Sequence, residues 1–286
     1  MRLARAGATG GRHRCERIGA RAHCQPLAAS DGVLSSWPRP MEPPTLHVVV
    51  PVFNEEDELA DHVRLLARHL EAHLGDFDWR ITVADNASID RTLAIAQELS
   101  RNDPRIAAVH LPEKGRGRAV KHVWTHDPAD VVAYMDVDLS SDLAHFPSLV
   151  RSLLSGYDIA IGTRNLPASR VHGRSLLRTI TSKAYLFLIR LVFPVHFSDA
   201  QCGFKAVTRR VAETLVPRIV DDEWFFDTEL LVMGELTGLR IYEEPVTWTD
   251  NPGSTVRVWK TATADLRGLW RLFVSRPWKT SRHGHG

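Results

Sequence analysis

Cysteine and net charge are both scarce in this chain of 286 residues. Its three cysteines, Cys15, Cys24 and Cys202, match neither the spacing of a metal site nor that of a disulfide framework. We therefore expect reducing conditions, as in the cytosol. The net charge of +2 is too small to drive nucleic-acid binding by the surface as a whole. Any basic function must be local, and no nucleic-acid partner is expected.

Long apolar runs are also missing. A membrane-spanning helix needs roughly 18 or more apolar residues in a row, and the nearest stretch, 184–193, is shorter and contains Arg190. The arginine-rich N-terminus lacks the apolar segment of a secretory signal. Two interpretations of residues 1–44 stay open, namely a disordered basic arm or a start of translation at Met41.

Short apolar runs are present, and they alternate with stretches of helical spacing. Hydrophobic residues make up 44% of the chain and charged residues 24%, as in ordinary soluble globular proteins. The alternation predicts an α/β domain with a mainly parallel sheet flanked by helices. Its expected strands cover residues 46–52, 79–84, 106–110, 131–135 and 158–162. After a loop over 163–173 we expect a helix over 175–193, a strand over 241–248 and a helix over 258–273.

Two carboxylates follow one of these strands. Asp136 and Asp138 stand directly after the apolar run 131–135. In open α/β sheets, ligands bind beyond the carboxyl ends of the strands, and two acids there repel each other unless a cation lies between them. Magnesium with a substrate diphosphate fits, because it prefers one or two carboxylates plus phosphate oxygens. The alternative is an ordinary strand end, with Asp138 or Ser141 capping the next helix.

Two basic segments carry further hypotheses. Glycines alternate with cations from Lys114 to Arg118, where backbone amides and side chains could approach an anion. A flexible basic loop fits that pattern equally well. From Ser175 to Phe193, cations and a broad apolar face share one predicted helix. That helix fits either an anionic membrane surface or packing on the sheet with its cations in solvent.

Several segments, in the same order along the chain, resemble the family 2 inverting glycosyltransferases of the GT-A fold. Within that family they are most similar to the polyprenyl (dolichyl) phosphate sugar synthases of the dolichyl-phosphate glucosyltransferase type. The matching segments are Val49–Glu56, Asp85–Thr92, Lys114–Ala119, Asp136–Asp138, Ala200–Lys205, Phe226–Leu231 and Val246–Ser254. The resemblance implies a Rossmann-like nucleotide-diphospho-sugar transferase domain over 45–275, followed by a flexible tail over 276–286.

The same resemblance implies roles for individual residues. Asp136 and Asp138 would hold the diphosphate and its Mg²⁺ or Mn²⁺, and they are expected to be catalytic together with Asp227. Arg164 and Arg178 would receive the acceptor phosphate. The residues expected around the nucleotide are Pro51, Asn54, Glu55, Asp85 and Lys114. Those expected to border the sugar and acceptor are Gln201, Trp224 and Glu229.

The implied reaction is inverting transfer of a hexose, glucose or mannose, from a UDP- or GDP-sugar to a polyprenyl phosphate at the cytoplasmic face of a membrane. A phosphate acceptor is already anionic, so positioning by arginines matters more than a general base. Asn86 departs from the family pattern, which has a second acid there. Because no membrane span is expected, the lipid must be reached through a surface helix or a separate membrane protein.

Other functions stay open at this stage. With a sugar or glycolipid hydroxyl as the acceptor, a general base is needed, and Asp227 or Glu229 is the candidate. Asp227 and Glu229 also fit a merely helix-stabilising role near a helix start. A nucleotidyltransferase would carry a glycine-rich basic loop after the first strand, where this chain has Phe53–Glu56. A non-catalytic membrane-binding protein is the remaining alternative.

Overall fold

The apolar runs of the chain form one seven-stranded sheet in the computed structural model, which describes residues 42–250 and 258–279, without the side chains of 258–262. The strand order is β3-β2-β1-β4-β7-β5-β8, and β7 runs antiparallel to both of its neighbours while the other pairs are parallel. This confirms the expected mainly parallel sheet. The strands are β1 Thr45–Val52, β2 Asp78–Asn86, β3 Ile106–Leu111, β4 Val131–Met135, β5 Ile159–Thr163, β7 Phe204–Thr208 and β8 Ile241–Pro245.

Helices cover both faces of this sheet, which explains why its central strands are apolar throughout. Along β4, Val132 and Tyr134 point into one hydrophobic core and Val131 and Met135 into the other. The second core is closed by α1 Leu59–His73, α2 Thr92–Asn102 and α4 Phe146–Leu154, the last entered through a helical turn over Leu143–His145. The first is closed by α3 Arg116–His126, α6 Arg209–Thr214 and α7 Phe226–Leu236, with a further turn over Val216–Arg218.

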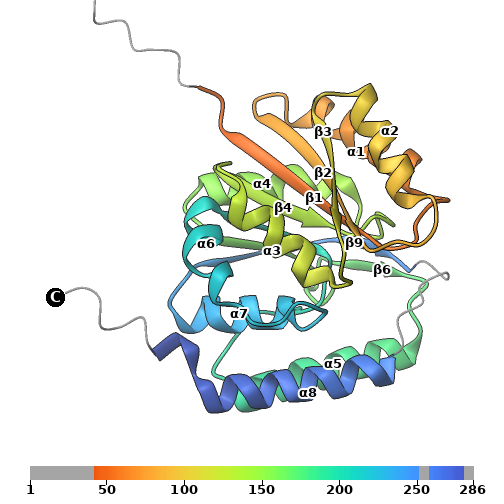
Figure 1. Cartoon of the computed structure of the whole chain (residues 1–286). Helices are drawn as coiled ribbons and strands as arrows, with labels where there is room; N and C mark the ends of the chain where they lie inside the picture. The colour runs from red at the N-terminus through yellow and green to blue at the C-terminus, as the bar shows by residue number, and fades with distance from the viewer. Residues whose placement is uncertain (1–41, 251–257, 280–286) are drawn as a thin grey trace, which may run out of the picture. The chain divides into compact units, whose positions relative to one another are not determined.

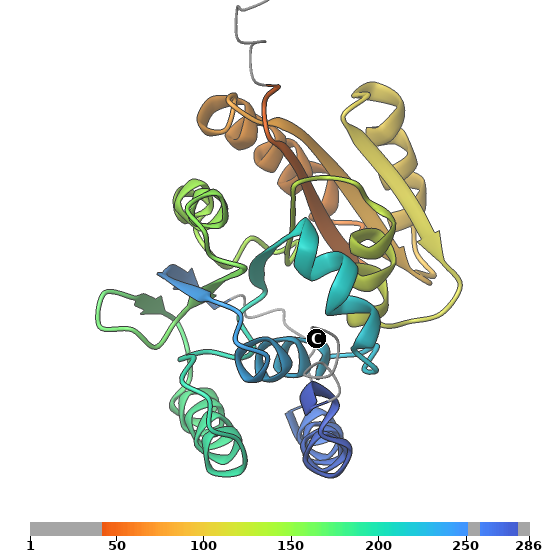
Figure 2. The ribbon, with the colours of Figure 1, turned by 90° about the vertical axis from the view of Figure 1, so that its left-hand side faces the viewer.

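Two long helices form an additional layer outside α7. They are α5 Leu176–Val192 and α8 Val258–Ser275, and they lie side by side in both ribbon views (Figures 1 and 2). Each inserts a few apolar side chains into the adjacent core, among them Ile189 from α5 and Leu269 from α8. Among residues 42–250 and 258–279, no helix is both long and apolar enough to cross a bilayer.

The predicted strand over 241–248 is interrupted, and this differs from the expectation. After β8 the chain leaves the main sheet at Val246 and continues as β9 Thr247–Thr249. There it pairs with β6 Arg170–His172, within the stretch expected to be a loop. The break is fixed by two backbone hydrogen bonds of Val246, whose N–H donates to Thr163 and whose carbonyl accepts from Arg170. The consequence is that Trp248 is carried over the end of β4.

Three predictions fall wholly or partly outside the described residues. They concern residues 1–41 of the N-terminal segment, 251–254 of the matching segment Val246–Ser254 and 280–286 of the expected tail. The tail begins differently from that expectation, because residues 277–279 form a helical turn. Trp278 packs edge-on against Phe193, with 5.6 Å between ring centroids.

Candidate active site

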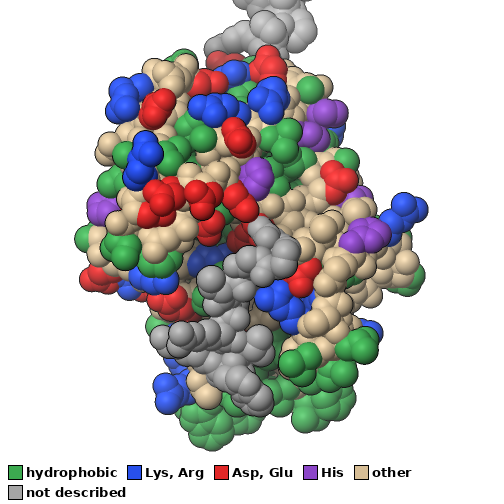
Figure 3. Space-filling view, turned by 90° about the vertical axis from the view of Figure 1, so that its right-hand side faces the viewer, with side chains coloured by type: hydrophobic (Ala, Val, Ile, Leu, Met, Phe, Trp, Pro, Cys, Tyr) green, Lys and Arg blue, Asp and Glu red, His purple; other side chains and the backbone are tan. Residues whose placement is uncertain are grey.

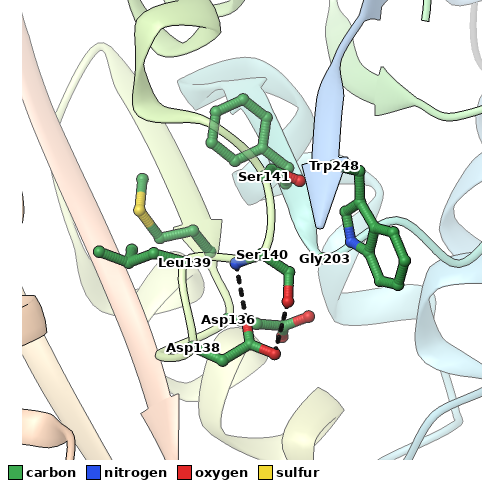
Figure 4. Close-up of a pocket in the computed structure, with 9 residues that line it drawn as sticks. Asp136, Asp138, Leu139, Ser140, Ser141, Gly203 and Trp248 are labelled. Carbon is green, nitrogen blue, oxygen red and sulfur yellow. Dashed lines mark hydrogen bonds between the residues drawn. The ribbon is translucent and has the colours of Figure 1, made fainter. Parts of the chain in front are cut away.

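The site begins where β4 ends. Asp136 follows Met135 directly, and its N–H donates to Gly203 at 3.1 Å. Leu139 then adopts a left-handed backbone with φ of 48°, which turns the chain sharply and leaves Asp138 beside Asp136. Figure 4 shows both carboxylates on the wall of a pocket, with Asp138 accepting hydrogen bonds from the N–H and hydroxyl of Ser140. The pocket is lined by Met135, Asp136, Asp138, Leu139, Ser140, Ser141, Gly203, Phe204 and Trp248.

Gly203 makes room for the Asp136 carboxylate. A Cβ atom at position 203 would lie 1.7 Å from Oδ2 of Asp136, far inside contact distance. Since β4 pairs with β7 so that Met135 lies opposite Phe204, the two segments are forced together at this point. Glycine is therefore needed at 203 for Asp136 to keep its position.

Arg116 connects Asp136 to the helix that begins at Phe226. Its Nε donates to Asp136 at 3.0 Å, and its terminal nitrogen donates to Asp227 at 2.6 Å. Its guanidinium also lies 4.7 Å from the centre of the Trp224 ring. The glycine loop predicted from the sequence is thus packed rather than flexible. A Cβ at Gly117 would lie 2.6 Å from the Cβ of Phe226.

Asp227 is fully engaged by its neighbours. Besides Arg116, it receives the ammonium of Lys205 at 3.1 Å and a short hydrogen bond from the Tyr134 hydroxyl. Burial raises the pKa of this carboxyl, but Lys205 and Arg116 outweigh burial and hold the pKa below its ordinary value. A buried carboxylate with a lowered pKa and three donors is a poor proton acceptor. These contacts speak against a general-base role for Asp227.

The residues expected around the nucleotide gather at the ends of β1 and β2. Asn54 has a left-handed φ of 56°, and its side chain accepts from the N–H of Ile89 at 3.0 Å. Pro51 pairs with Ala84 in the sheet. Asp85 is fully buried and its carboxylate lies 2.6 Å from Nδ1 of His110.

Lys114 and Asn86 complete this region. The Lys114 ammonium lies 3.4 Å from the centre of the Phe53 ring, which brings the lysine to the end of β1. Asn86 is buried, and its Oδ1 has no hydrogen-bond partner in the structure. The residue that departs from the family pattern therefore contributes an unused acceptor beside the expected nucleotide residues.

Acidic side chains dominate the surface near this end of the sheet (Figure 3). Burial raises the pKa of Glu55 to about 7, with further contributions from Glu58, Asp138, Asp90 and Asp136. Burial likewise raises the pKa of Asp136, because Arg116 offsets only part of that effect. The local excess of negative charge is what a bound cation would relieve.

Asp136 and Asp138 fit a divalent cation shared with a substrate. Among the described residues, no cluster of three or more His, Cys, Asp or Glu forms a metal cage. Mg²⁺ and similar hard cations are often held by one or two carboxylates, with water and phosphate oxygens completing the shell. Two carboxylates on a pocket wall suit that mode of binding, in which the ion arrives with a diphosphate.

The two arginines expected to bind the acceptor phosphate each already have an acidic partner, and Arg164 also lies 5.4 Å from the centre of the Trp248 ring. Arg164 is nearly buried and holds Asp199 through two hydrogen bonds, at 2.7 and 2.9 Å. Arg178 pairs with Asp250 at 2.5 Å. The pair keeps the pKa of Asp199 at about 2, since Arg164 outweighs the effect of burial.

Arg174 is the cation of this group that the sequence did not single out. It lies 5.8 Å from the centre of the Trp248 ring, and no carboxylate of the described residues pairs with it. Burial, followed by repulsion from Arg164, lowers the pKa of its guanidinium. An anion between Arg164, Arg174 and Trp248 would be electrostatically favoured.

The three residues expected to border the sugar and acceptor are separated in the structure. Gln201 lines a second pocket and donates to Asp265 of α8 at 3.2 Å. Trp224 is 40% exposed beside Arg116. Glu229 is buried and faces away, because it accepts from the N–H groups of Val220 and Asp221 and pairs with Arg271.

Comparison with known proteins places the chain in context. Residues 47–216 match the model of glycosyl transferase family 2. The chain is 36% identical over 241 residues to glycosyltransferase AglD of Haloferax volcanii, covering 82% of this chain and 38% of AglD. It is 28% identical over 220 residues to dolichyl-phosphate beta-glucosyltransferase ALG5C of Trichomonas vaginalis, covering 73% of this chain and 65% of that protein. The chain thus spans less than two thirds of these relatives.

The fold is also similar to that of a solved glycosyltransferase structure. Glucosyl-3-phosphoglycerate synthase of Mycobacterium tuberculosis, in complex with Mn²⁺, UDP-glucose and phosphoglyceric acid, superposes with a TM-score of 0.58. The match covers 82% of this chain and 80% of that chain at 17% identity, so it carries the fold alone. The family match, the GT-A sheet and the paired acids after β4 agree, and the chain belongs to glycosyl transferase family 2.

Proposed function

We propose that the protein transfers a hexose from a UDP- or GDP-sugar to a polyprenyl phosphate, with inversion at the anomeric carbon. The observation that carries the proposal is the pairing of two oppositely charged regions at one end of the sheet. Acids suited to a cation-bound diphosphate lie after β4, and arginines suited to a phosphate surround Trp248. The relative named above as a dolichyl-phosphate beta-glucosyltransferase supports a lipid phosphate as acceptor.

In this reaction an oxygen of the acceptor phosphate forms a bond to the anomeric carbon, while the bond from that carbon to the donor diphosphate breaks. Asp136 and Asp138 would hold Mg²⁺ or Mn²⁺, which would supply Lewis-acid stabilisation of the leaving diphosphate. Arg116 fixes the orientation of the Asp136 carboxylate. Lys114, beside Phe53, is near enough to the end of β1 to contact the nucleotide.

The acceptor needs orientation more than deprotonation, because a phosphate monoester is already anionic near neutral pH. Arg174 and the half-exposed Arg178 provide cationic groups for its oxygens. The contacts of Asp227 favour this acceptor over a hydroxyl, since its carboxylate is occupied by Lys205, Arg116 and Tyr134.

The lipid chain of such an acceptor requires an apolar surface near the arginines. The outer faces of α5 and α8 expose large apolar side chains; Phe187 and Trp270 are each 68% exposed. Hydrophobic side chains gather at the lower end of the face in Figure 3, where Figure 1 draws these two helices. The exposed set is Leu176, Leu177, Ile180, Phe187, Leu191, Leu266, Trp270, Phe273 and Val274.

Apolar patches with a basic rim bind membrane surfaces. Exposed Lys183, Arg190 and Arg267 border the apolar set. We therefore infer peripheral association with the cytoplasmic face of a membrane through α5 and α8, with no separate membrane protein required for access to the lipid.

One assay tests the function. The full chain is incubated with Mg²⁺ or Mn²⁺, a short polyprenyl phosphate and a panel of UDP- and GDP-hexoses, and the glycolipid is identified by mass spectrometry. The matched polyprenol, which lacks the phosphate, is the control acceptor. We expect a metal-dependent glycosyl phosphate lipid and no product from the polyprenol. Transfer to the polyprenol at a similar rate would reject the phosphate acceptor.

A further inference from the structure

Lys205 is a buried cation for which the proposed reaction has no use. It lies on β7 opposite Tyr134 of β4, and its side chain is fully buried. Its ammonium lies 3.1 Å from Oδ1 of Asp227 and donates a hydrogen bond to the carbonyl of Cys202 at 2.5 Å. Removing an ammonium group from water is costly, so a buried charge is kept only where it is paired and hydrogen-bonded. These partners explain how the charge is tolerated, and their own contacts indicate what it does.

On one side, Lys205 is connected to the cation site through side chains. Asp227 lies between two cations, because its Oδ1 faces Lys205 while its Oδ2 accepts from Arg116 at 2.6 Å. Arg116 in turn donates from Nε to Asp136 at 3.0 Å. Arg116 is therefore shared between two carboxylates, and Lys205 balances the charge of the inner one. Without Lys205, the uncompensated carboxylate of Asp227 would draw Arg116 away from Asp136.

On the other side, Lys205 is connected to Asp136 through the backbone. Its hydrogen bond to the Cys202 carbonyl closes the bend of the chain at Gly203. The carbonyl of Gly203 accepts from the N–H of Asp136 at 3.1 Å. The Cα of Gly203 also approaches the Asp136 carboxylate so closely that no Cβ would fit between them. Both the backbone and the side chain of Asp136 therefore depend on where the bend holds Gly203.

We propose that Lys205 is a positioning residue for the cation site, and that it fixes Asp136 both through the side chains of Asp227 and Arg116 and through the bend at Gly203. This inference rests on the proposed function, because it takes Asp136 as a ligand of the divalent cation. Lys205 itself is out of reach of donor and acceptor, since its side chain has no exposed surface. Asp227 is then the link between two cations, which gives this buried acid a role other than that of a base.

The lysine side chain suits this task. Its ammonium carries three N–H donors at the end of a flexible stem. Three acceptors surround it here, namely the Asp227 carboxylate, the Cys202 carbonyl and, at 3.5 Å, the hydroxyl oxygen of Tyr134. Methionine is also unbranched and flexible but has no N–H donor. Lys205→Met should therefore fill the same space in the core while it removes the charge and the hydrogen bonds.

The test compares four variants of the full chain: Lys205→Met, Asp227→Asn, the double variant with both substitutions, and Lys121→Met. Lys121 is the matched control, because its partly buried ammonium also pairs with an aspartate, Asp222 at 2.5 Å, and donates to a carbonyl, that of Ile219. Binding of Mn²⁺ in the presence of UDP or GDP is measured by calorimetry. Turnover is measured with polyprenyl phosphate, and stability is measured by thermal unfolding.

In Lys205→Met we expect kcat to fall by about 100-fold and the affinity for Mn²⁺ by about tenfold, because a displaced Asp136 no longer holds the cation at the leaving diphosphate. KM for polyprenyl phosphate should stay within about twofold, since the arginines near Trp248 are untouched. The double variant should recover about tenfold of the lost kcat, because Asp227→Asn removes the charge that competes for Arg116. A lysine with only a structural role would give no such recovery. Lys121→Met should keep the wild-type kcat and Mn²⁺ affinity.

Wild-type kcat and Mn²⁺ affinity in Lys205→Met, with or without a lower melting temperature, would overturn the inference while the proposed function stands. A double variant no more active than Lys205→Met would overturn it as well. Should Lys205→Met not fold, the double variant decides, because it leaves no buried carboxylate without its lysine. Its kcat should be about tenfold below that of the wild type, since the bend at Gly203 is still loosened, and an unchanged kcat would reject the inference. If the wild type transfers no hexose to polyprenyl phosphate, the proposed function fails, and Mn²⁺ binding still tests the role of Lys205.

Discussion

The two charged regions at the carboxyl end of the sheet are opposite in sign and suit different kinds of anion. After β4, acids crowd together, and burial with repulsion from neighbouring acids raises the pKa of Glu55 to about 7. Around Trp248, arginines crowd together, and burial with repulsion from Arg164 lowers the pKa of Arg174. The acidic region suits an anion that arrives with its own cation, whereas the basic region suits an anion that arrives without one.

The largest effect is expected from neutralising the acidic region at its centre. Asp138→Asn should reduce metal-dependent turnover by about 10²–10³-fold, because the developing charge on the leaving diphosphate is no longer held. The Asp138 carboxylate accepts hydrogen bonds from the N–H and hydroxyl of Ser140, two residues away, so stability should change little. Turnover is measured with saturating donor, with Asp76→Asn as the matched control. Near-normal turnover in Asp138→Asn would remove the basis for a cation site.

The second largest effect is expected from a substitution at Gly203, which displaces the Asp136 carboxylate without changing its chemical group. Gly203→Ala puts a methyl group 1.7 Å from Oδ2 of Asp136, so the carboxylate must move away from Arg116. We expect turnover to fall by more than tenfold, with a loss of about 1–3 kcal/mol in unfolding free energy from overpacking. Gly75→Ala, where the added atom would meet its nearest neighbour at 3.4 Å, is the control. A fully active Gly203→Ala variant would contradict the close packing described here.

The basic region is tested through Arg174. Arg174→Ala should raise KM for the polyprenyl phosphate by about 10–100-fold, the equivalent of one lost charge-assisted hydrogen bond of roughly 1.5–3 kcal/mol. Donor KM should stay the same, since the acidic region is untouched. Arg170→Ala, on the exposed strand β6, serves as the control. If Arg174→Ala changes KM for the donor as much as KM for the polyprenyl phosphate, the acidic and basic regions do not act separately.

The smallest effect concerns pH and the acidic region. Because the pKa of Glu55 is raised to about 7, this group is mostly protonated below pH 7 and charged above it. A cation favours the charged form, so Mn²⁺ affinity should rise severalfold as the pH increases from 6 to 8. Glu55→Gln should flatten that dependence, which calorimetric titration at several pH values would detect. An equally steep dependence in Glu55→Gln would assign it to another group.

Much of this architecture was predictable because it depends on local pattern. The strand over Val131–Met135 has the predicted bounds, since five buried apolar residues between polar neighbours leave little choice. Asp136 and Asp138 come directly after that strand, so their position at the carboxyl end of the sheet could be predicted from the sequence. The predicted strand over 241–248 failed at Val246, because its bend depends on pairing with distant residues.

The rest of the site depends on distances between segments that no local pattern reveals. Arg116 and Asp227 are 111 residues apart in the sequence, and their contact at 2.6 Å makes Asp227, the candidate base for a hydroxyl acceptor, a buried partner of cations. Asp265 looked like one polar residue of an amphipathic helix, and its burial follows from how α8 packs. For Arg116, the basic glycine loop was a usable signal. For Asp265, no signal in the sequence was available.

The antiparallel strand β7 has a consequence for the order of folding. In the described sheet, β5 and β8 connect to β1–β4 through β7 alone, since β7 lies between β4 and β5. A nascent chain that ends before Phe204 therefore holds the sheet of β1–β4 with β5 still unpaired, and Asp136 lacks the Gly203 carbonyl that accepts from its N–H. Insertion of β7 joins β5 to this sheet, and β8 then adds to β5. Native-state hydrogen exchange should accordingly find β5, β7 and β8 opening together, as one cooperative unit.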